Sequence, residues 1–300
     1  MSSRAAAVNV DVDSLYLYYR LHGFEEDDAN NAVWTRGVRR FAELFDELDV
    51  RGTFFVVAAD LERWPEAREV ATELVEAGHE LGSHTYSHPY DFTRRSDAEI
   101  EDELKRSHDV ISELVGRPIQ GFRAPGYTIT APILERMEGL GYTYDSSLFP
   151  CPPYYLAKAS VMGMMRLRGR RSEAILDRPS IMWQRRTPHW RSGIRELPIT
   201  VLPGLRPPFI GTSLLMMGRS GYRAIRPWVR STSFVNLEFH GIDLCDLEID
   251  GIDPVLLKQP DLRVPLADKL ALFREVITDL RDGWNLDTLE NLAPTLVPAS

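Results

Sequence analysis

Cysteine is scarce in this sequence, with only Cys151 and Cys245 among 300 residues. The two cysteines are far apart and match no ligand spacing, which argues against a cysteine-based metal site. Long apolar runs are missing too, because no window approaches the roughly 18 uninterrupted apolar residues of a transmembrane helix. The first residues lack the apolar core of a signal peptide. We therefore expect a cytoplasmic protein with two reduced thiols.

The remaining composition is that of an ordinary globular protein. Hydrophobic residues make up 44% of the chain and charged residues 26%, both close to the usual values. Internal repeats and low-complexity tracts are absent. A chain of this length can form one large domain or two small ones, and it can bury a sizeable core.

Charge is distributed unevenly along the chain. The net charge is −9, yet fifteen lysines and arginines and only three acidic residues fall within residues 151–230. This separation favours a basic face that meets something anionic. An alternative is a solvated surface whose charges are paired with the acidic remainder. Nucleic acid is not expected as a partner, because the chain is acidic overall and shows no recognised binding motif.

The basic segment also carries apolar clusters. Stretches such as VMGMM, IMW and PPFIGTSLLMMG alternate with arginines. This combination suits an anionic membrane surface or a phospholipid-like carrier. It makes a peripheral position at the inner face of the membrane a prediction. We also expect residues of this segment to line the binding pocket.

Strand-like runs alternate with segments of helical periodicity. The clearest strands are expected at 5–13, 52–59, 196–203 and 233–243, and the clearest helices at 30–50, 64–78, 96–116 and 265–283. This alternation predicts an α/β fold with a parallel sheet of right-handed crossovers. A (β/α) barrel, incomplete in places, fits better than two domains. We expect one domain over residues 1–300, with an irregular basic insertion at about 151–232.

Ionisable residues follow the ends of five expected strands. They are Asp11 and Asp13, His84 and His88, Arg123, Asp145, and His240. The active sites of parallel barrels lie at the carboxyl ends of the strands, so these side chains should meet at one rim. Alternation along the first strand places Asp11 and Asp13 on the same side.

Two histidines and one carboxylate can hold Zn²⁺ or a similar ion and leave an open position. A second carboxylate then remains as a base, and a histidine opposite can act as an acid. The same ligands form the facial triad of non-haem Fe(II) oxygenases, which is one alternative. Another is an inactive protein that binds a lipid-linked glycan.

Five short motifs resemble those of the NodB-homology polysaccharide deacetylases, carbohydrate esterase family 4. They are VNVDVD, HELGSHTYSH, FRAPGY, YDSS and LEFHG, in this order. The resemblance extends from residue 5 to about 243 and implies a distorted (β/α)₇-type barrel. The first motif has D-V-D where secreted members have T-F-D-D-G. This spacing is similar to that of intracellular relatives, including deformylases of a lipid-linked aminoarabinose.

The resemblance implies a role for each site residue. Asp11 is the expected base, Arg123 orients it, His240 is the general acid, and Asp145 supports that acid. Asp13, His84 and His88 are the expected ligands of one divalent ion, with Zn favoured over Co, Mn or Ni. The substrate-binding residues are expected to be Pro125, Gly126 and Tyr127, with a backbone N–H near Tyr127 holding the oxyanion. The implied reaction removes an acetyl or formyl group from a nucleotide- or lipid-linked amino sugar.

Overall fold

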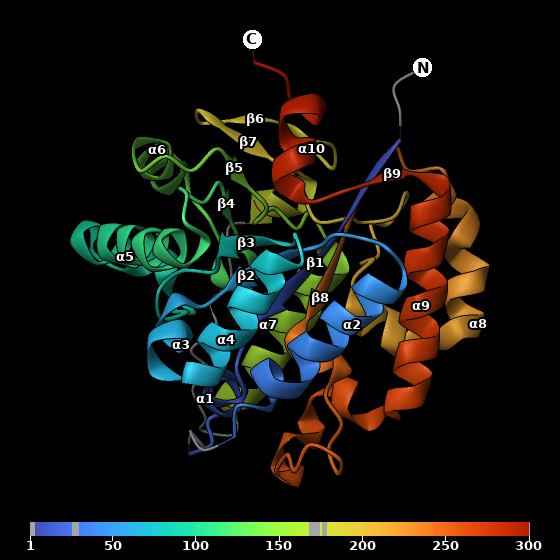
Figure 1. Cartoon of the computed structure of the whole chain (residues 1–300). Helices are drawn as coiled ribbons and strands as arrows, with labels where there is room; N and C mark the ends of the chain where they lie inside the picture. Colours follow the sequence, from blue (N-terminus) through green and yellow to red (C-terminus); the bar gives the residue numbers. More distant parts are fainter. Residues whose placement is uncertain (1–3, 26–29, 168–174, 176–178, 300) are drawn as a thin grey trace.

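A computed structural model describes residues 4–25, 30–167, 175 and 179–299. A curved, mainly parallel sheet forms its centre (Figure 1). The strands are β1 (Ala5–Val12), β2 (Thr53–Val56), β3 (Glu80–Ser83), β4 (Gly121–Phe122), β5 (Tyr144–Asp145), β6 (His189–Arg191), β7 (Ile194–Glu196), β8 (Phe234–His240) and β9 (Asn285–Leu286). Their order is β6-β7-β5-β4-β3-β2-β1-β8, and β9 pairs with the start of β1. Only the β6–β7 pair is antiparallel, so the predicted parallel α/β fold is confirmed.

Helices connect the strands and cover the sheet (Figure 1). The α-helices are α1 (Leu15–His22), α2 (Arg39–Glu47), α3 (Ala58–Arg63), α4 (Pro65–Glu76), α5 (Asp97–Val115), α6 (Ala131–Gly139), α7 (Pro152–Leu167), α8 (Gly211–Arg230), α9 (Leu266–Gly283) and α10 (Leu289–Leu296). Shorter helical segments are η1 (Val33–Val38), η2 (Phe92–Arg94), η3 (Pro125–Tyr127), η4 (Pro179–Trp183), η5 (Gly241–Leu244), η6 (Pro254–Lys258) and η7 (Pro260–Arg263). A capping box of Ser96 and Glu99 starts α5.

The two ends of the parallel sheet meet through the segment that follows β7. The backbone N–H of Thr200 donates to the carbonyl of Asn236 on β8 at 3.0 Å. The Thr200 hydroxyl accepts from the N–H of Asn236 at 2.7 Å. Irregular pairing of this kind closes a distorted barrel in place of a regular strand ladder. The seven parallel strands β1–β5, β7 and β8 therefore surround one interior.

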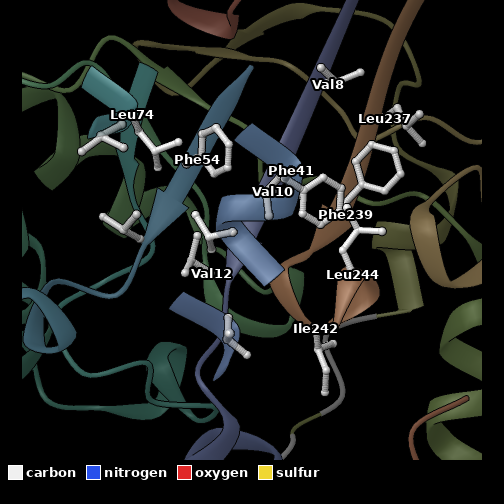
Figure 2. Packing of buried hydrophobic residues seen from close by; sticks show 14 of the residues in the cluster. Val8, Val10, Val12, Phe41, Phe54, Leu74, Leu237, Phe239, Ile242 and Leu244 are labelled. Atoms are coloured by element: carbon white, nitrogen blue, oxygen red, sulfur yellow. The ribbon is translucent and has the colours of Figure 1, made fainter. Parts of the chain in front are cut away.

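Alternation along β1 separates the core from the barrel interior. Val8, Val10 and Val12 are fully buried against helices, where they pack with aromatic residues such as Phe41 (Figure 2). The Phe41 and Phe239 ring centroids lie 5.2 Å apart. Each fully buried side chain of this size stabilises the fold by about 1.5–3 kcal/mol. The odd-numbered residues of β1 consequently face the opposite side, toward the barrel interior.

The described parts of segment 151–232 are more regular than the sequence indicates, while residues 168–174 and 176–178 of the expected insertion lie outside the described residues. They contain helix α7 and the β6–β7 hairpin, but β7 also pairs with β5 and α8 packs on α9 and β8. Strand β7 and helix α8 are therefore part of the barrel layers. Gly218, Gly221 and Pro227 lie within α8, and such residues hide a helix from periodicity arguments. A single-domain organisation stays a prediction, which the β1–β9 pairing of the two chain ends supports.

Candidate active site

The register of the sheet aligns the strand ends that carry the chemistry. Asp11 is the partner of His240 across β1 and β8. Ser83, directly before His84, is the partner of Phe122, directly before Arg123. Parallel strands place their carboxyl ends at one edge. The ends of β1 and β8 point to the side of the molecule where α1 and the segment after β8 lie (Figure 1).

One cluster combines Asp13, His84 and His88, whose ligand atoms lie within 4.8 Å of one another. The Oδ1 atom of Asp13 is 3.4 Å from Nε2 of His84 and 3.3 Å from Nε2 of His88. This Oδ1 atom is buried and has no hydrogen-bond partner in the described part of the chain. A buried carboxylate oxygen between two imidazole nitrogens fits a divalent cation.

Protonation in this cluster also suits metal binding. The Nδ1 atom of His84 lies 2.8 Å from the carbonyl of Arg123, which makes Nδ1 the protonated nitrogen and leaves the Nε2 lone pair free. Burial lowers the pKa of His88 to about 4, so this imidazole is neutral at pH 7. Burial alone would raise the pKa of Asp13, but His88 and His84 outweigh it and lower the pKa. His88 and Asp13 are thus in the state that a cation requires. Burial alone would lower the pKa of His84, but Asp11 and Asp13 raise it, so a cation would have to displace a proton from this imidazole.

The loop that presents the histidines has an unusual backbone. Thr85 and His88 have φ angles of 66° and 55°, in the left-handed region that non-glycine residues seldom adopt. The Thr85 hydroxyl accepts from the N–H of His88 at 3.1 Å, which fixes the turn. Backbone strain of this kind costs about 1–3 kcal/mol per residue and concentrates at functional sites. The turn directs both rings toward Asp13.

A buried ion pair fixes the second aspartate of β1. The guanidinium of Arg123 donates to Oδ1 of Asp11 at 2.6 Å, and both side chains are almost completely buried. Arg123 also donates to Asn9 and to the carbonyl and hydroxyl of Ser146. Burial raises the pKa of Asp11 while Arg123 lowers it, and the net direction is upward. Asp11 is therefore a fixed carboxylate of increased basicity beside the metal-type cluster.

His240 faces this carboxylate from β8. Its Nδ1 atom lies 2.8 Å from Oε1 of Glu238, and the same oxygen accepts from the Tyr127 hydroxyl at 3.3 Å. Burial alone would lower the pKa of His240, but Glu238, Asp13 and Asp11 raise it well above its usual value. The imidazole is consequently protonated at neutral pH, as a general acid must be.

The metal-type cluster and the pair of Asp11 and His240 line one cavity of about 270 Å³. Its wall includes Asp11, Asp13, His84, His88 and His240. As expected, part of the wall comes from segment 151–232, namely Tyr154, Lys158, Ile210 and Thr212. Further residues come from α1 and from the segment after β8, where no motif predicted a part of the site. The cavity thus brings a possible cation-binding cluster together with Asp11 and His240.

Comparison with known proteins agrees with this arrangement. Residues 27–144 match the polysaccharide deacetylase family. The peptidoglycan deacetylase of Helicobacter pylori is 30% identical over 156 residues, which are 50% of this chain and 52% of that protein. A Shewanella sediminis protein named as a 4-deoxy-4-formamido-L-arabinose-phosphoundecaprenol deformylase is 31% identical over 75 residues, 24% of each chain.

Over this part of its length the chain resembles the polysaccharide deacetylase family. The resemblance of the five motifs to this family is therefore confirmed. A Mycobacterium smegmatis crystal structure described as a polysaccharide deacetylase has the same fold, with a TM-score of 0.59 and 18% identity over 99% of this chain and 91% of that chain. The match to the H. pylori relative spans only about half of that protein's length. No helix in the described ranges is long and apolar enough to cross a membrane.

One expected contact of the deacetylase motifs is not formed. Asp145 is at the end of β5, as predicted, but it lies against Glu196 of β7 and accepts from the Ser147 hydroxyl at 2.5 Å. It does not line the cavity beside His240. Burial raises the pKa of both Asp145 and Glu196. The structure therefore places Asp145 in a buried carboxyl pair, and Glu238 occupies the position beside the acid.

The sequence reasoning missed Glu238, although a signal was present. In LEFHG, Glu238 and His240 are two residues apart on a strand, so their side chains share one face. A wholly buried acid next to a histidine on that face fits a supporting role better than an acid at the end of another strand.

The expected substrate-binding residues occupy different positions. Gly126 and Tyr127 line the cavity, whereas Pro125 does not. The N–H of Tyr127 donates to the carbonyl of Ala124 at 3.1 Å. In this conformation the Tyr127 amide is therefore occupied and cannot bind an oxyanion. Tyr127 contributes its ring and hydroxyl to the site.

Proposed function

We propose that this protein is a metal-dependent hydrolase that removes an N-acetyl or N-formyl group from an amino sugar. The observation that supports this most strongly is the separation of roles within one cavity. Asp13, His84 and His88 are close enough together to hold a cation, while Asp11 and His240 are held by other partners, Arg123 and Glu238. A purely structural metal site does not require a separate base and acid.

A divalent cation, with zinc favoured over cobalt, manganese or nickel, would bind to Asp13, His84 and His88. When bound, such a cation polarises the acyl carbonyl and lowers the pKa of water toward neutrality. The oxygenase alternative is less well supported, since those enzymes usually present this triad on an antiparallel sheet. Here β1 and β3 belong to a parallel sheet.

Asp11 is the proposed proton acceptor. Its Oδ1 atom is held by Arg123, which leaves Oδ2 to accept the proton of the water that attacks the acyl carbon. A fixed carboxylate whose pKa is raised by burial is a more effective base than a solvated one. Arg123 is a positioning residue, because it acts through Asp11.

His240 is the proposed proton donor to the leaving amine. Glu238 accepts from Nδ1, so Nε2 carries the proton that can be transferred. This Nε2 atom is 3.9 Å from Oδ2 of Asp13, so the acid lies next to the proposed cation site. Acid and base therefore act on one acyl group held between β1 and β8.

The size and surroundings of the cavity favour a sugar that is attached to a larger carrier. A cavity of about 270 Å³ is at the small end of ligand pockets and suits one sugar ring. Helix α7 contributes Tyr154 and Lys158 to the cavity. The same helix exposes Leu156 (64%), Val161 (57%) and Leu167 (90%). This supports a lipid-linked substrate and peripheral contact with the inner face of the membrane, from the cytoplasmic side.

Release of acetate or formate from N-acyl amino sugars tests the proposal. We expect the zinc-loaded protein to release acid and the chelated protein to release none until zinc is restored. Asp11→Asn should keep its zinc and lose turnover by about 10²–10⁴-fold, as is typical for loss of a general base. Full activity of Asp11→Asn would contradict the role given to this residue.

A further inference from the structure

A second group of residues lines the cavity without a part in the proposed chemistry. It consists of Tyr18 from α1, Asp261 from η7, and Gln259 directly before η7. We call this group the polar wall. Its members come from segments far apart in the sequence, and no family motif contains them. Polar side chains that line the cavity outside the proposed catalytic groups indicate recognition of a polar ligand.

The polar wall contains unsatisfied hydrogen-bonding atoms. The side chain of Tyr18 is 6% exposed and that of Asp261 is 3% exposed. The Tyr18 hydroxyl and Oδ1 of Asp261 have no hydrogen-bond partner among the described residues. Buried polar groups without partners are destabilising and uncommon in native proteins. Both atoms belong to residues that line the cavity, so a ligand in the cavity can satisfy them.

The surroundings hold the polar wall in place. Asp243 lies close enough to Asp261 for the two carboxyl groups to interact electrostatically, and the buried Lys269 interacts with both. Asp243 accepts from the N–H of His240 at 3.0 Å. A Cβ atom on Gly211 would lie 2.1 Å from Asp243, so the start of α8 packs directly on this carboxylate. The wall is therefore coupled to the segment that carries the proposed acid.

The chemistry of the wall selects one class of ligand group. A carboxylate only accepts hydrogen bonds, whereas a phenol at neutral pH both donates and accepts. A neutral hydroxyl can donate to Asp261 and accept from Tyr18. A carboxylate or phosphate on the ligand would be repelled by the Asp261 carboxylate. Burial raises the pKa of Asp243 well above its usual value, so Asp243 adds no negative charge. A negatively charged part of the substrate fits instead beside Lys158, which lines the cavity from α7.

We propose that Asp261 and Tyr18 bind a ring hydroxyl of the substrate and exclude an anionic substituent at that position. This inference rests on the proposed function, because the acyl group must lie at the cation site for the ring to reach the wall. The substrate is then limited to an amino sugar that carries a neutral hydroxyl group where its ring contacts Asp261 and Tyr18. It also makes Asp261 a residue that determines specificity.

Equilibrium binding to zinc-loaded Asp11→Asn protein tests the inference without requiring turnover. The probes are the methyl glycosides of N-acetylglucosamine and N-acetylgalactosamine, together with N-cyclohexylacetamide, which has an amide on a six-membered ring but no hydroxyl. N-acetylmuramic acid adds an anionic substituent. We expect the better glycoside to bind at least tenfold more tightly than N-cyclohexylacetamide and than N-acetylmuramic acid.

Variants at the wall identify the cause of this preference. Asp261→Asn and Tyr18→Phe should each weaken glycoside binding by roughly 5–20-fold, as expected for one hydrogen bond, and leave N-cyclohexylacetamide unaffected. Asp261→Asn should also reduce the difference in affinity between the better glycoside and N-acetylmuramic acid. Asp268→Asn, an exposed aspartate at the start of α9, is the matched control and should bind all probes like the parent. Melting temperatures establish that each variant is folded.

Two results would overturn the inference. One is binding of N-cyclohexylacetamide as tight as that of both glycosides. The other is an equal loss of affinity for all probes in the folded Asp261→Asn and Tyr18→Phe proteins. Such a loss would indicate that Asp261 and Tyr18 have a structural role. Failure of the proposed function gives a different result. The wild-type protein would then release no acetate or formate, whether or not the binding preference and its loss in the variants are observed.

Discussion

Oε1 of Glu238 lies 2.8 Å from Nδ1 of His240, and both residues lie at the carboxyl end of β8. Burial alone would raise the pKa of Glu238, but His240 and Arg123 lower it. The carboxylate is therefore charged and holds His240 in its protonated form. Loss of this contact should lower the pKa of His240, the proposed acid, without changing metal binding.

Glu238→Gln should reduce turnover by about 10–100-fold, with KM and zinc content unchanged, because the acid loses its partner. The pKa of His240 should fall, so the alkaline limb of the turnover–pH profile should move to lower pH. Glu248→Gln, on an exposed residue of the following segment, is the control. A profile that is lowered evenly at every pH would indicate that Glu238 does not tune His240.

Arg123→Lys tests whether the guanidinium shape is required. Arg123 is fully buried and donates to Asp11, Asn9 and Ser146. A lysine cannot make these contacts, so we expect a loss of about 3–5 kcal/mol in the free energy of unfolding, measured with urea. Arg117→Lys is the control, since its pair with Glu290 is 48% exposed on the arginine side and should change stability by less than about 1 kcal/mol. Equal effects of the two substitutions would contradict this reasoning.

Acid should destabilise the protein partly through His79. This histidine accepts from the N–H of Gly52 at 3.1 Å and packs against the Phe54 ring at 5.3 Å. Burial lowers its pKa to about 4 from 6.5. Between these values the unfolded chain binds more protons than the folded one, so stability falls as the pH drops from about 6.5 to 4.

The expected contribution of His79 is about 3 kcal/mol over that range. Urea unfolding at pH 7 and pH 4.5 should show a smaller acid effect for His79→Gln than for the wild type. The comparison must be made between variants, because burial raises the pKa of Glu80 to about 7 and this gives a stability change of opposite sign. An identical loss of stability between pH 7 and pH 4.5 in both proteins would exclude His79 as a source of the acid destabilisation.

The exposed apolar residues of α7 predict binding to vesicles. Leu156→Asp and Leu167→Asp should each weaken binding to anionic phospholipid vesicles by about tenfold, because they remove apolar contact and add a negative charge. Sedimentation with vesicles measures the effect. Ile249→Asp is the control, since Ile249 is 68% exposed but lies outside segment 151–230. Equal loss in Ile249→Asp would argue against contact through α7.

Much of the barrel could be predicted because its strands follow simple periodicity. Alternation in β1 places Val8 and Val10 in the core and Asp11 and Asp13 in the interior, and the parallel topology then aligns the strand ends. The meeting of these side chains at one rim required nothing further. The choice of Asp13 as the ligand and of Arg123 as the partner of Asp11 came from the resemblance to the deacetylase family. The roles given to these residues stay predictions until activity is measured.

The remaining parts depend on packing that no local pattern records. Strand β5 is only two residues long, so the sequence could not show that Asp145 faces Glu196. Asp261 reaches the cavity from an irregular segment that follows β8. Helix α8 is interrupted by glycine and proline, which weakened its periodic signal. Each case involves short or irregular elements whose partners are distant in sequence.

Metal content of the untagged protein, measured by mass spectrometry beside the His84→Ala/His88→Ala variant, tests the central claim most directly. The account predicts about one zinc, cobalt, manganese or nickel ion per wild-type chain and none in the folded double variant. Absence of metal from both proteins after reconstitution, or equal metal in both, would contradict the assignment of Asp13, His84 and His88 as a cation site.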